Sequence, residues 1–111
     1  MEPVNEASQL YEVERRVLHA ERPGFRISEL QIGPHQFVPW HLHTAISDTF
    51  YVLEGAITVS LRNPDEMVRL HPGQVYSVPA LRPHHVANAS PGSSTFLVLQ
   101  GMGSYDYVPL P

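Results

Sequence analysis

Apolar residues occur in short runs along this chain, and proline, glycine, asparagine or aspartate separate each run from the next. Residues 25–32 alternate apolar and polar positions, with a change of face expected near residues 28–29, which is typical of a half-buried strand. The run that ends at Glu54-Gly55 and the run AITVSL after it predict a hairpin. Turn signals recur about every 8 to 12 residues, so the pattern predicts about eight short strands in an all-β sandwich or barrel.

The length of 111 residues fits one domain with a single core. We expect residues 1–22 to form an N-terminal arm and residues 23–111 to form the domain. Helical periodicity is weak, and the 11 prolines disfavour long helices. The aromatic, proline-rich tail at residues 101–111 is expected to pack on the domain.

The composition narrows the possible functions. Apolar residues make up 42% and charged residues 16%, as in a globular protein. The net charge of -4 argues against nucleic acid and anionic membranes as partners. All basic residues are arginine and cysteine is absent, which excludes a lysine Schiff base, a cysteine nucleophile and thiolate ligands. No apolar run could span a bilayer and the N-terminus is too polar for a signal peptide, so we expect a cytoplasmic protein.

Three histidines and one aspartate, all residue types that can bind metal ions, lie at the starts of apolar runs or just before them. His41 and His43 lie two apart on a predicted strand, so both face the same side about 6.6 Å apart. Asp48 follows after four residues, and a turn or bulge there would return its carboxylate to the same cavity. His84 offers a third imidazole from a neighbouring strand. A buried unpaired carboxylate is costly, and this set suits one divalent transition metal ion per chain: Mn, Fe, Co, Ni or Zn.

The spacing of these residues resembles the two motifs of the cupin superfamily. The first motif runs His-x-His, three or four residues, an acid, six residues and Gly, and here it falls on His41, His43, Asp48 and Gly55. The second runs Gly, five residues, Pro-x-Gly, two residues, His, three residues and Asn. It falls on Gly73, Pro79, His84 and Asn88.

Three positions depart from the pattern. Asp48 replaces the usual glutamate and is shorter by one methylene, about 1.5 Å of reach. Direct binding of the ion, binding through water and support of the other ligands all stay open for it. Leu81 replaces a glycine, which affects a turn rather than a ligand. Seven residues separate Gly33 from His41, where the motif usually has five.

The resemblance implies a jelly-roll (RmlC-like) β-barrel with a metal at its centre, and a homodimer. It does not imply one reaction, because the family includes oxygenases, isomerases, lyases and non-catalytic binding domains. The leading hypothesis is therefore a metal-dependent enzyme acting on a small organic molecule in the barrel cavity. The alternative is a non-catalytic ligand-binding or sensor module.

Other residues are assigned by their position relative to these ligands. His35, Phe50 and Val52 are candidates to line the cavity. His35 precedes His41 by six residues, which predicts the same face, and a loop histidine after Gly33-Pro34 is the competing interpretation. His85 points away from His84 and is expected to pack on the surface.

The aromatic residues Phe37, Phe50, Tyr51, Tyr76 and Phe96 are expected in the core. Trp40 is assigned to packing or to a dimer face. Asn88 is expected to support its strand end through backbone hydrogen bonds.

Overall fold

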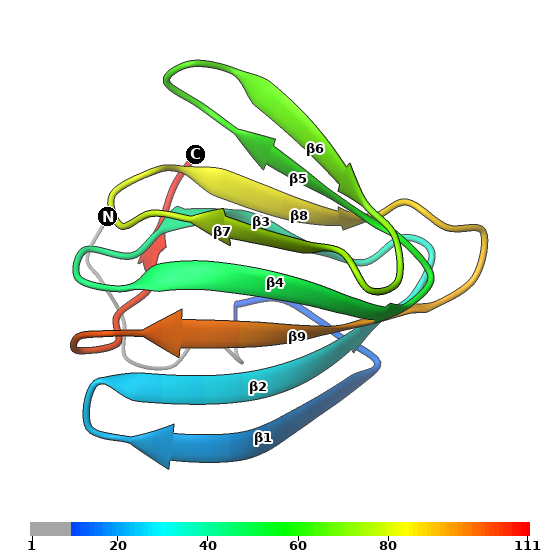
Figure 1. Ribbon diagram of the computed structural model, residues 1–111. Coiled ribbons are helices and arrows are strands. Elements are labelled where there is room, and N and C mark those ends of the chain that lie inside the picture. The colour runs from blue at the N-terminus through cyan, green and yellow to red at the C-terminus, as the bar shows by residue number, and fades with distance from the viewer. Residues whose placement is uncertain (1–9) are drawn as a thin grey trace.

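The protein is described by a computed structural model, and the described residues are 10–111. These residues form ten strands in two five-stranded antiparallel sheets (Figure 1). The strands are β1 (Arg15–Arg22), β2 (Phe25–Ile32), β3 (Phe37–Leu42), β4 (Ser47–Glu54), β5 (Ile57–Leu61), β6 (Glu66–Leu70), β7 (Val75–Val78), β8 (His84–Asn88), β9 (Ser94–Gly101) and β10 (Val108–Pro109). Within residues 10–111 no helix is long and apolar enough to cross a membrane.

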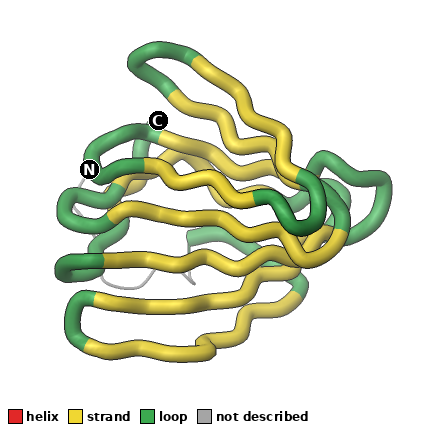
Figure 2. Tube along the Cα trace, in the orientation of Figure 1, coloured by secondary structure: helices red, strands yellow, loops and turns green. Residues whose placement is uncertain are grey.

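The chain passes repeatedly from one sheet to the other. The first sheet has the order β1-β2-β9-β4-β7, and the second has the order β10-β3-β8-β5-β6. Only the connections β1–β2 and β5–β6 stay within one sheet, and the other connections between the ten strands cross from one sheet to the other. Figure 2 shows the loops that join the strands at both ends of the barrel. The two inner faces enclose one core, so the predicted all-β jelly-roll barrel is confirmed.

The inward-facing side chains change from polar to apolar along the barrel. On β4 the inward series runs from Asp48 through Phe50 to Val52. On β9 it runs in the opposite chain direction, from Gln100 to Phe96, and the register pairs Asp48 with Gln100 and Val52 with Phe96. We call the end that holds Asp48 the polar end, at the left in Figure 1, and the opposite end the apolar end.

Strand β3 contains an irregularity that decides which of its side chains face inward. Val38 pairs with Val86 and His41 pairs with His84, so three steps on β3 match two on β8. This extra residue is a β-bulge, and it lets both Val38 and His41 face the interior. The bulge reverses the alternation of every residue before it.

Two predictions about the first strands are wrong. Residues 15–22 do not belong to an arm, because they form β1 and pair with β2. Residues 25–32 keep a regular alternation, with Arg26 and Ser28 facing inward like Leu30. The sequence suggested a change of face because the polar end of the barrel places hydrophilic side chains inside. The part of the predicted arm at residues 1–9 lies outside the described residues.

The predicted core is only partly confirmed. Phe50 and Phe96 are buried, and Tyr76 packs against the core. Phe37 and Tyr51 are exposed on the outer faces, so their assignment to the core was wrong. The bulge turns Phe37 outward, and Tyr51 alternates with the inward-facing side chains on either side of it.

The outward Phe37 takes part in a surface stack. The ring of His85 lies 5.1 Å from Phe37 and 5.6 Å from Trp40, between centroids. The guanidinium carbon of Arg62 lies over the ring of Trp40, 3.9 Å from its centroid. These contacts confirm that His85 points away from His84 and packs at the surface.

Candidate metal centre

Three strands and a bend bring the four predicted ligands together. His41 lies on β3, His43 directly after it, Asp48 at the start of β4 and His84 at the start of β8. The bend at residues 44–46 returns the chain toward the barrel, as the gap before Asp48 predicts. All four residues lie at the polar end and are at most 3% exposed.

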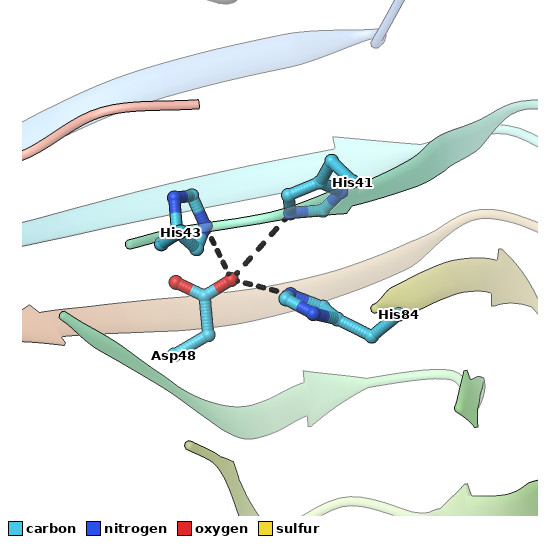
Figure 3. A group of neighbouring side chains, drawn as sticks. All are labelled: His41, His43, Asp48 and His84. Carbon is cyan, nitrogen blue, oxygen red and sulfur yellow. Dashed lines mark hydrogen bonds and ion pairs between the residues drawn. The ribbon is translucent and has the colours of Figure 1, made fainter. Parts of the chain in front are cut away.

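The three imidazoles converge on one carboxylate oxygen (Figure 3). The Oδ2 atom of Asp48 lies 2.7 Å from Nε2 of His84 and 2.9 Å from Nε2 of His43. Nε2 of His41 lies farther away, at 3.6 Å. One possible ligand atom from each residue falls within 4.8 Å of all the others, which is close enough for one ion to contact all four.

Backbone carbonyls fix the orientation of each ring. Nδ1 of His41 lies 2.8 Å from the carbonyl of Pro39, and Nδ1 of His84 lies 2.9 Å from that of Arg82. Nδ1 of His43 contacts the carbonyl of Asp106. A carbonyl can only accept a hydrogen bond, so each Nδ1 must donate. In the neutral imidazoles, each Nε2 therefore carries a lone pair.

This arrangement leaves several acceptors facing one another. Three Nε2 lone pairs and a carboxylate oxygen share one buried space, which is repulsive without protons or a cation among them. A divalent metal ion accepts lone pairs from all four atoms and neutralises the carboxylate. The donor set therefore fits such an ion, and the Nδ1 contacts are the outer hydrogen bonds typical of metal-binding histidines.

The ionisation of the cluster supports the same interpretation. Burial lowers the pKa of His41 to about 4, despite the neighbouring carboxylate of Asp48. Burial raises the pKa of Asp48, but the charge of His43 and the interactions with the three histidines outweigh it and hold the pKa well below the usual value. Burial also lowers the pKa of His43, yet the charge of Asp48 and its hydrogen bond reverse this and raise the pKa. The metal-free cluster thus keeps a carboxylate and at least one neutral imidazole at neutral pH.

The sequence itself matches the cupin domain family over residues 28–105. The chain belongs to the cupin family. This match covers most of the chain and includes all four residues of the cluster.

Solved structures with the same fold support this assignment. This cupin is similar to an uncharacterized conserved protein with a double-stranded β-helix domain from Klebsiella pneumoniae, with a TM-score of 0.75 and 18% identity over 87% of this chain and 84% of the other. It is also similar to an oxalate oxidase, with a TM-score of 0.72 and 17% identity over 79% of this chain and 47% of the other. A third similar structure is described as one of two DMSP lyases, with a TM-score of 0.67 and 25% identity. The match covers 78% of this chain and 44% of the other.

The cupin chain spans less than half of the length of these last two proteins. Comparison with curated proteins finds no match. These likenesses establish the fold, and the chemistry must be argued from the residues of this chain.

Hydrogen bonds from Gln100 and from the C-terminal segment fix the orientation of two cluster residues. Nε2 of Gln100 donates to Oδ1 of Asp48 at 2.7 Å, which leaves Oδ2 aimed at the histidines. The C-terminal segment holds His43 through the backbone of Asp106, whose carboxylate also accepts from the backbone N–H and the hydroxyl of Thr44 at 2.9 and 2.6 Å. The predicted packing of the tail is confirmed, and it contributes to the cupin site.

A cavity of about 70 Å³ opens beside the cluster. Its floor includes His41, His43 and Asp48, and its wall is largely apolar. The lining is Tyr11, Arg16, Leu18, Arg26, Ser28, Leu30, Val38, His41, His43, Asp48, Phe50, Val86, Phe96, Val98, Gln100, Tyr105 and Tyr107. The volume is small compared with a drug-sized site, so the ligand must be small.

The structure separates the predicted cavity-lining residues. Phe50 lines the cavity, whereas Val52 is buried in the core beyond it. His35 lies exposed in a turn and does not reach the cavity, so that prediction was wrong. The even spacing from His41 failed because the β3 bulge lies between the two residues.

Asn88 supports its strand end as predicted. Its amide donates to the carbonyls of Ile32 and Gly92, and its oxygen accepts from Ser90 and Ser94.

Several residues at the site were missed from the sequence: Arg16, Arg26, Gln100, Tyr105 and Tyr107. For Gln100 and Arg26 the signal was present, because both continue the inward alternation of their strands. Tyr105 and Tyr107 carry no such signal, since neither lies within one of the ten strands.

Proposed function

We propose that this cupin is a metal-dependent enzyme of the oxygenase, isomerase or lyase type that acts on a small organic molecule. The observation that carries the proposal is the convergence of three Nδ1-anchored histidines on one oxygen of Asp48, at the floor of a cavity. A site built only for structure needs no cavity beside it. The oxalate oxidase and lyase neighbours add support at the level of the fold.

The residues divide the work of such a site. His41, His43, Asp48 and His84 would hold the ion, and a bound divalent metal would supply Lewis-acid or redox chemistry. Gln100 holds the carboxylate of Asp48 in orientation through Oδ1. The apolar wall excludes water from the reacting molecule, which strengthens electrostatic interactions inside.

The direct experiment compares two adjacent histidines. Protein purified without a His-tag and without added metal is assayed by elemental analysis, alongside His84→Ala and His85→Ala. We expect about one metal ion per chain in the wild type and in His85→Ala, because His85 faces outward. His84→Ala should lose the ion. Equal metal content in both variants, or none in the folded wild type, would defeat the proposal.

The identity of the bound ion directs the search for a reaction. Iron would call for oxygen-consumption assays on small organic acids and alcohols, whereas zinc, nickel or manganese would call for isomerase and lyase assays. A tightly bound ion with no turnover of any such compound would favour the non-catalytic binding module.

We also propose that the protein is a homodimer, as the family resemblance implies. The outer face of β4 and β7 supports this, because Tyr51, Leu53 and Val75 lie together there and are 38%, 39% and 52% exposed. Light scattering on the wild type and on Val75→Asp tests it. A monomeric wild type would contradict it. The cytoplasmic location stays a prediction.

A further inference from the structure

The cavity contains polar groups that metal binding does not use. Arg26 points inward from β2, Arg16 lies at the mouth on β1, and Tyr107 stands beside the cluster on the C-terminal segment. Two of these side chains bury a polar atom with no hydrogen-bond partner among the described residues: Nε of Arg26 and the hydroxyl of Tyr107. Such groups are rare in folded proteins and need an explanation.

The guanidinium of Arg26 is held in place but incompletely satisfied. It lies over the ring of Tyr105, 4.4 Å from the centroid. Its Nε atom is 3.5 Å from Oε2 of Glu21, which is an ion-pair distance without hydrogen-bond geometry. The Arg26 side chain is 18% exposed and that of Glu21 is 55% exposed, so Glu21 acts largely from solvent.

Tyr107 places a second unused hydroxyl close to the ligands. Its ring stacks on His41, with the centroids 4.4 Å apart and the planes 11° apart. The residue is 2% exposed, so its hydroxyl has little access to bulk water. Tyr107 lines the same cavity as Arg26.

The register places Arg26 within reach of the metal cluster. Arg26 pairs with Gln100, and Gln100 pairs with Asp48 on its other side. Two strand spacings separate the backbones of Arg26 and Asp48 by about 10 Å. A cavity of about 70 Å³ fills the space near them, which in this measure is room for roughly five water-sized groups.

From these contacts we infer that the ligand is a small carboxylate of about two to four carbons. Its carboxylate accepts hydrogen bonds from Nε of Arg26 and the hydroxyl of Tyr107, and Arg16 adds positive charge at the mouth. The rest of the molecule faces the ion. The inference rests on the proposed function, because it places the ligand beside a bound metal.

The charges in the cavity favour an anion over a neutral ligand. Two arginines line it, and Asp48 is the acid among the lining residues. A divalent ion at the cluster would add two further positive charges. A carboxylate would satisfy both unused donors at once and offset the excess charge.

The test measures ligand binding rather than turnover. Zinc-loaded protein is titrated calorimetrically with lactate, pyruvate and malonate, and with lactamide as the neutral match of lactate. The variants are Arg26→Met, which keeps the apolar stem, Arg26→Lys, which keeps the charge, and Arg15→Met as control. Arg15 pairs with Glu29 and lies outside the cavity. Zinc content is measured for every protein.

We expect at least one carboxylate to bind the wild type more tightly than lactamide. Arg26→Met should weaken the binding of that carboxylate by about tenfold or more. Zinc content and lactamide binding should stay unchanged. Arg26→Lys should show a smaller loss, and Arg15→Met none. Failure of all three carboxylates to bind better than lactamide would overturn the inference, as would full affinity in Arg26→Met.

Tyr107→Phe separates ligand binding from a structural role. It removes a hydroxyl that has no hydrogen-bond partner within residues 10–111, so the ligand-free variant should be at least as stable as the wild type. Its carboxylate affinity should fall severalfold. Reduced stability with unchanged affinity would show that the hydroxyl is structural, and would contradict the inference.

Failure of the metal proposal would look different. The protein would then bind no zinc, and titration of the metal-free chain would still report whether Arg26 and Tyr107 hold a carboxylate.

Discussion

The two ends of the barrel are built from the same strands but differ in the side chains that face the interior. At the apolar end, Val52, Phe96 and Ile32 are fully buried and close the core. At the polar end, the same strands carry Asp48, Gln100 and Arg26 inward. The apolar end gains stability from the burial of apolar side chains. The polar end buries a cluster of acceptors instead, which is stable only with protons or an ion among them.

The apolar end also contains a polar network around Ser94 and Asn88, and both side chains have hydrogen-bond partners within residues 10–111. Ser94 is fully buried, accepts from the backbone N–H of Ala56 and donates to the oxygen of Asn88 or the carbonyl of Ala56. The polar end differs because two of its buried polar atoms have no partner in the described chain. From this contrast we infer that the apolar end stabilises the fold and that the polar end binds the metal and the ligand.

The largest expected effect comes from disturbing the packing around Ser94 at the apolar end. Gly55 has a positive φ of 77°, and a Cβ there would lie 2.2 Å from Oγ of Ser94 and 2.9 Å from the carbonyl of Ser93. We expect Gly55→Ala to lower the free energy of unfolding by about 3 kcal/mol or more, from left-handed strain and overpacking together. Urea denaturation measures the change.

Gly73 provides the matched control. It also has a positive φ, 86°, but a Cβ there meets no atom within 4 Å. Gly73→Ala should therefore cost only the conformational penalty of about 1 kcal/mol. Similar losses in the two variants would show that packing on Ser94 is unimportant.

Acid should destabilise the metal-free protein through the polar end. The folded-state pKa of His41 is about 4, below its ordinary value of 6.5, so the unfolded chain binds a proton that the folded chain does not. Stability should fall as the pH falls from about 6.5 to 4, by up to about 3 kcal/mol. The lowered pKa of Asp48 extends the loss below its ordinary value of 3.8.

His43 has the opposite effect on stability, at the higher-pH side of the profile of stability against pH. Its pKa is raised, so its contribution is complete below its ordinary value of 6.5 and is lost as the pH rises through the folded-state pKa. Thermal melting of the metal-free protein across this range measures the profile. Constant stability from pH 7 to pH 4 would contradict the buried, neutral state of His41.

A smaller effect is expected from loosening Asp48 without removing a ligand. Gln100→Leu deletes the donor to Oδ1 of Asp48 and keeps a similar volume. We expect metal affinity to fall by about 10- to 100-fold. Competition with a chelator of known affinity measures it, and unchanged affinity would show that Gln100 does not position the carboxylate.

The smallest effect is a gain in stability at the rim of the polar end. Leu81 stands at a φ of 73°, 63% exposed, where the family motif has glycine, and its backbone N–H donates to the carbonyl of His43. Leu81→Gly should relieve left-handed strain of about 1–2 kcal/mol, partly offset by the flexibility of glycine in the unfolded chain. A net gain of about 0.5–1 kcal/mol is expected from thermal melting. A loss would mean that the Leu81 side chain stabilises the turn.

Much of the polar end could be predicted because its key residues lie close in sequence or at fixed spacings. His41, His43 and Asp48 come from one segment, and the spacing around His84 added the fourth member. Phe50, a candidate for the core and for the cavity wall, is found in both. What failed was alternation across the β3 bulge, which no residue type indicates, so His35 was assigned to the cavity. Phe37 was assigned to the core because it is aromatic, and the same bulge turns it outward.

The residues that complete the cavity are harder to find in this way. Arg26 continues the inward alternation of β2, but its charge favours a surface assignment until the register of β2 against β9 is known. Tyr107 reaches the cluster because β10 pairs with β3, a contact between segments more than 60 residues apart. Hydrophobic patterning reports burial, and it cannot report a polar side chain that is buried for binding.

The most direct test of the central claim is X-ray absorption spectroscopy at the zinc edge of the zinc-loaded protein. We predict a spectrum with three imidazole nitrogens and one or two oxygens at about 2.0–2.2 Å, and we predict that His84→Ala loses this spectrum because it loses the ion. A zinc ion surrounded by oxygen alone, or a spectrum that His84→Ala leaves unchanged, would show that the four side chains of the polar end do not hold the ion.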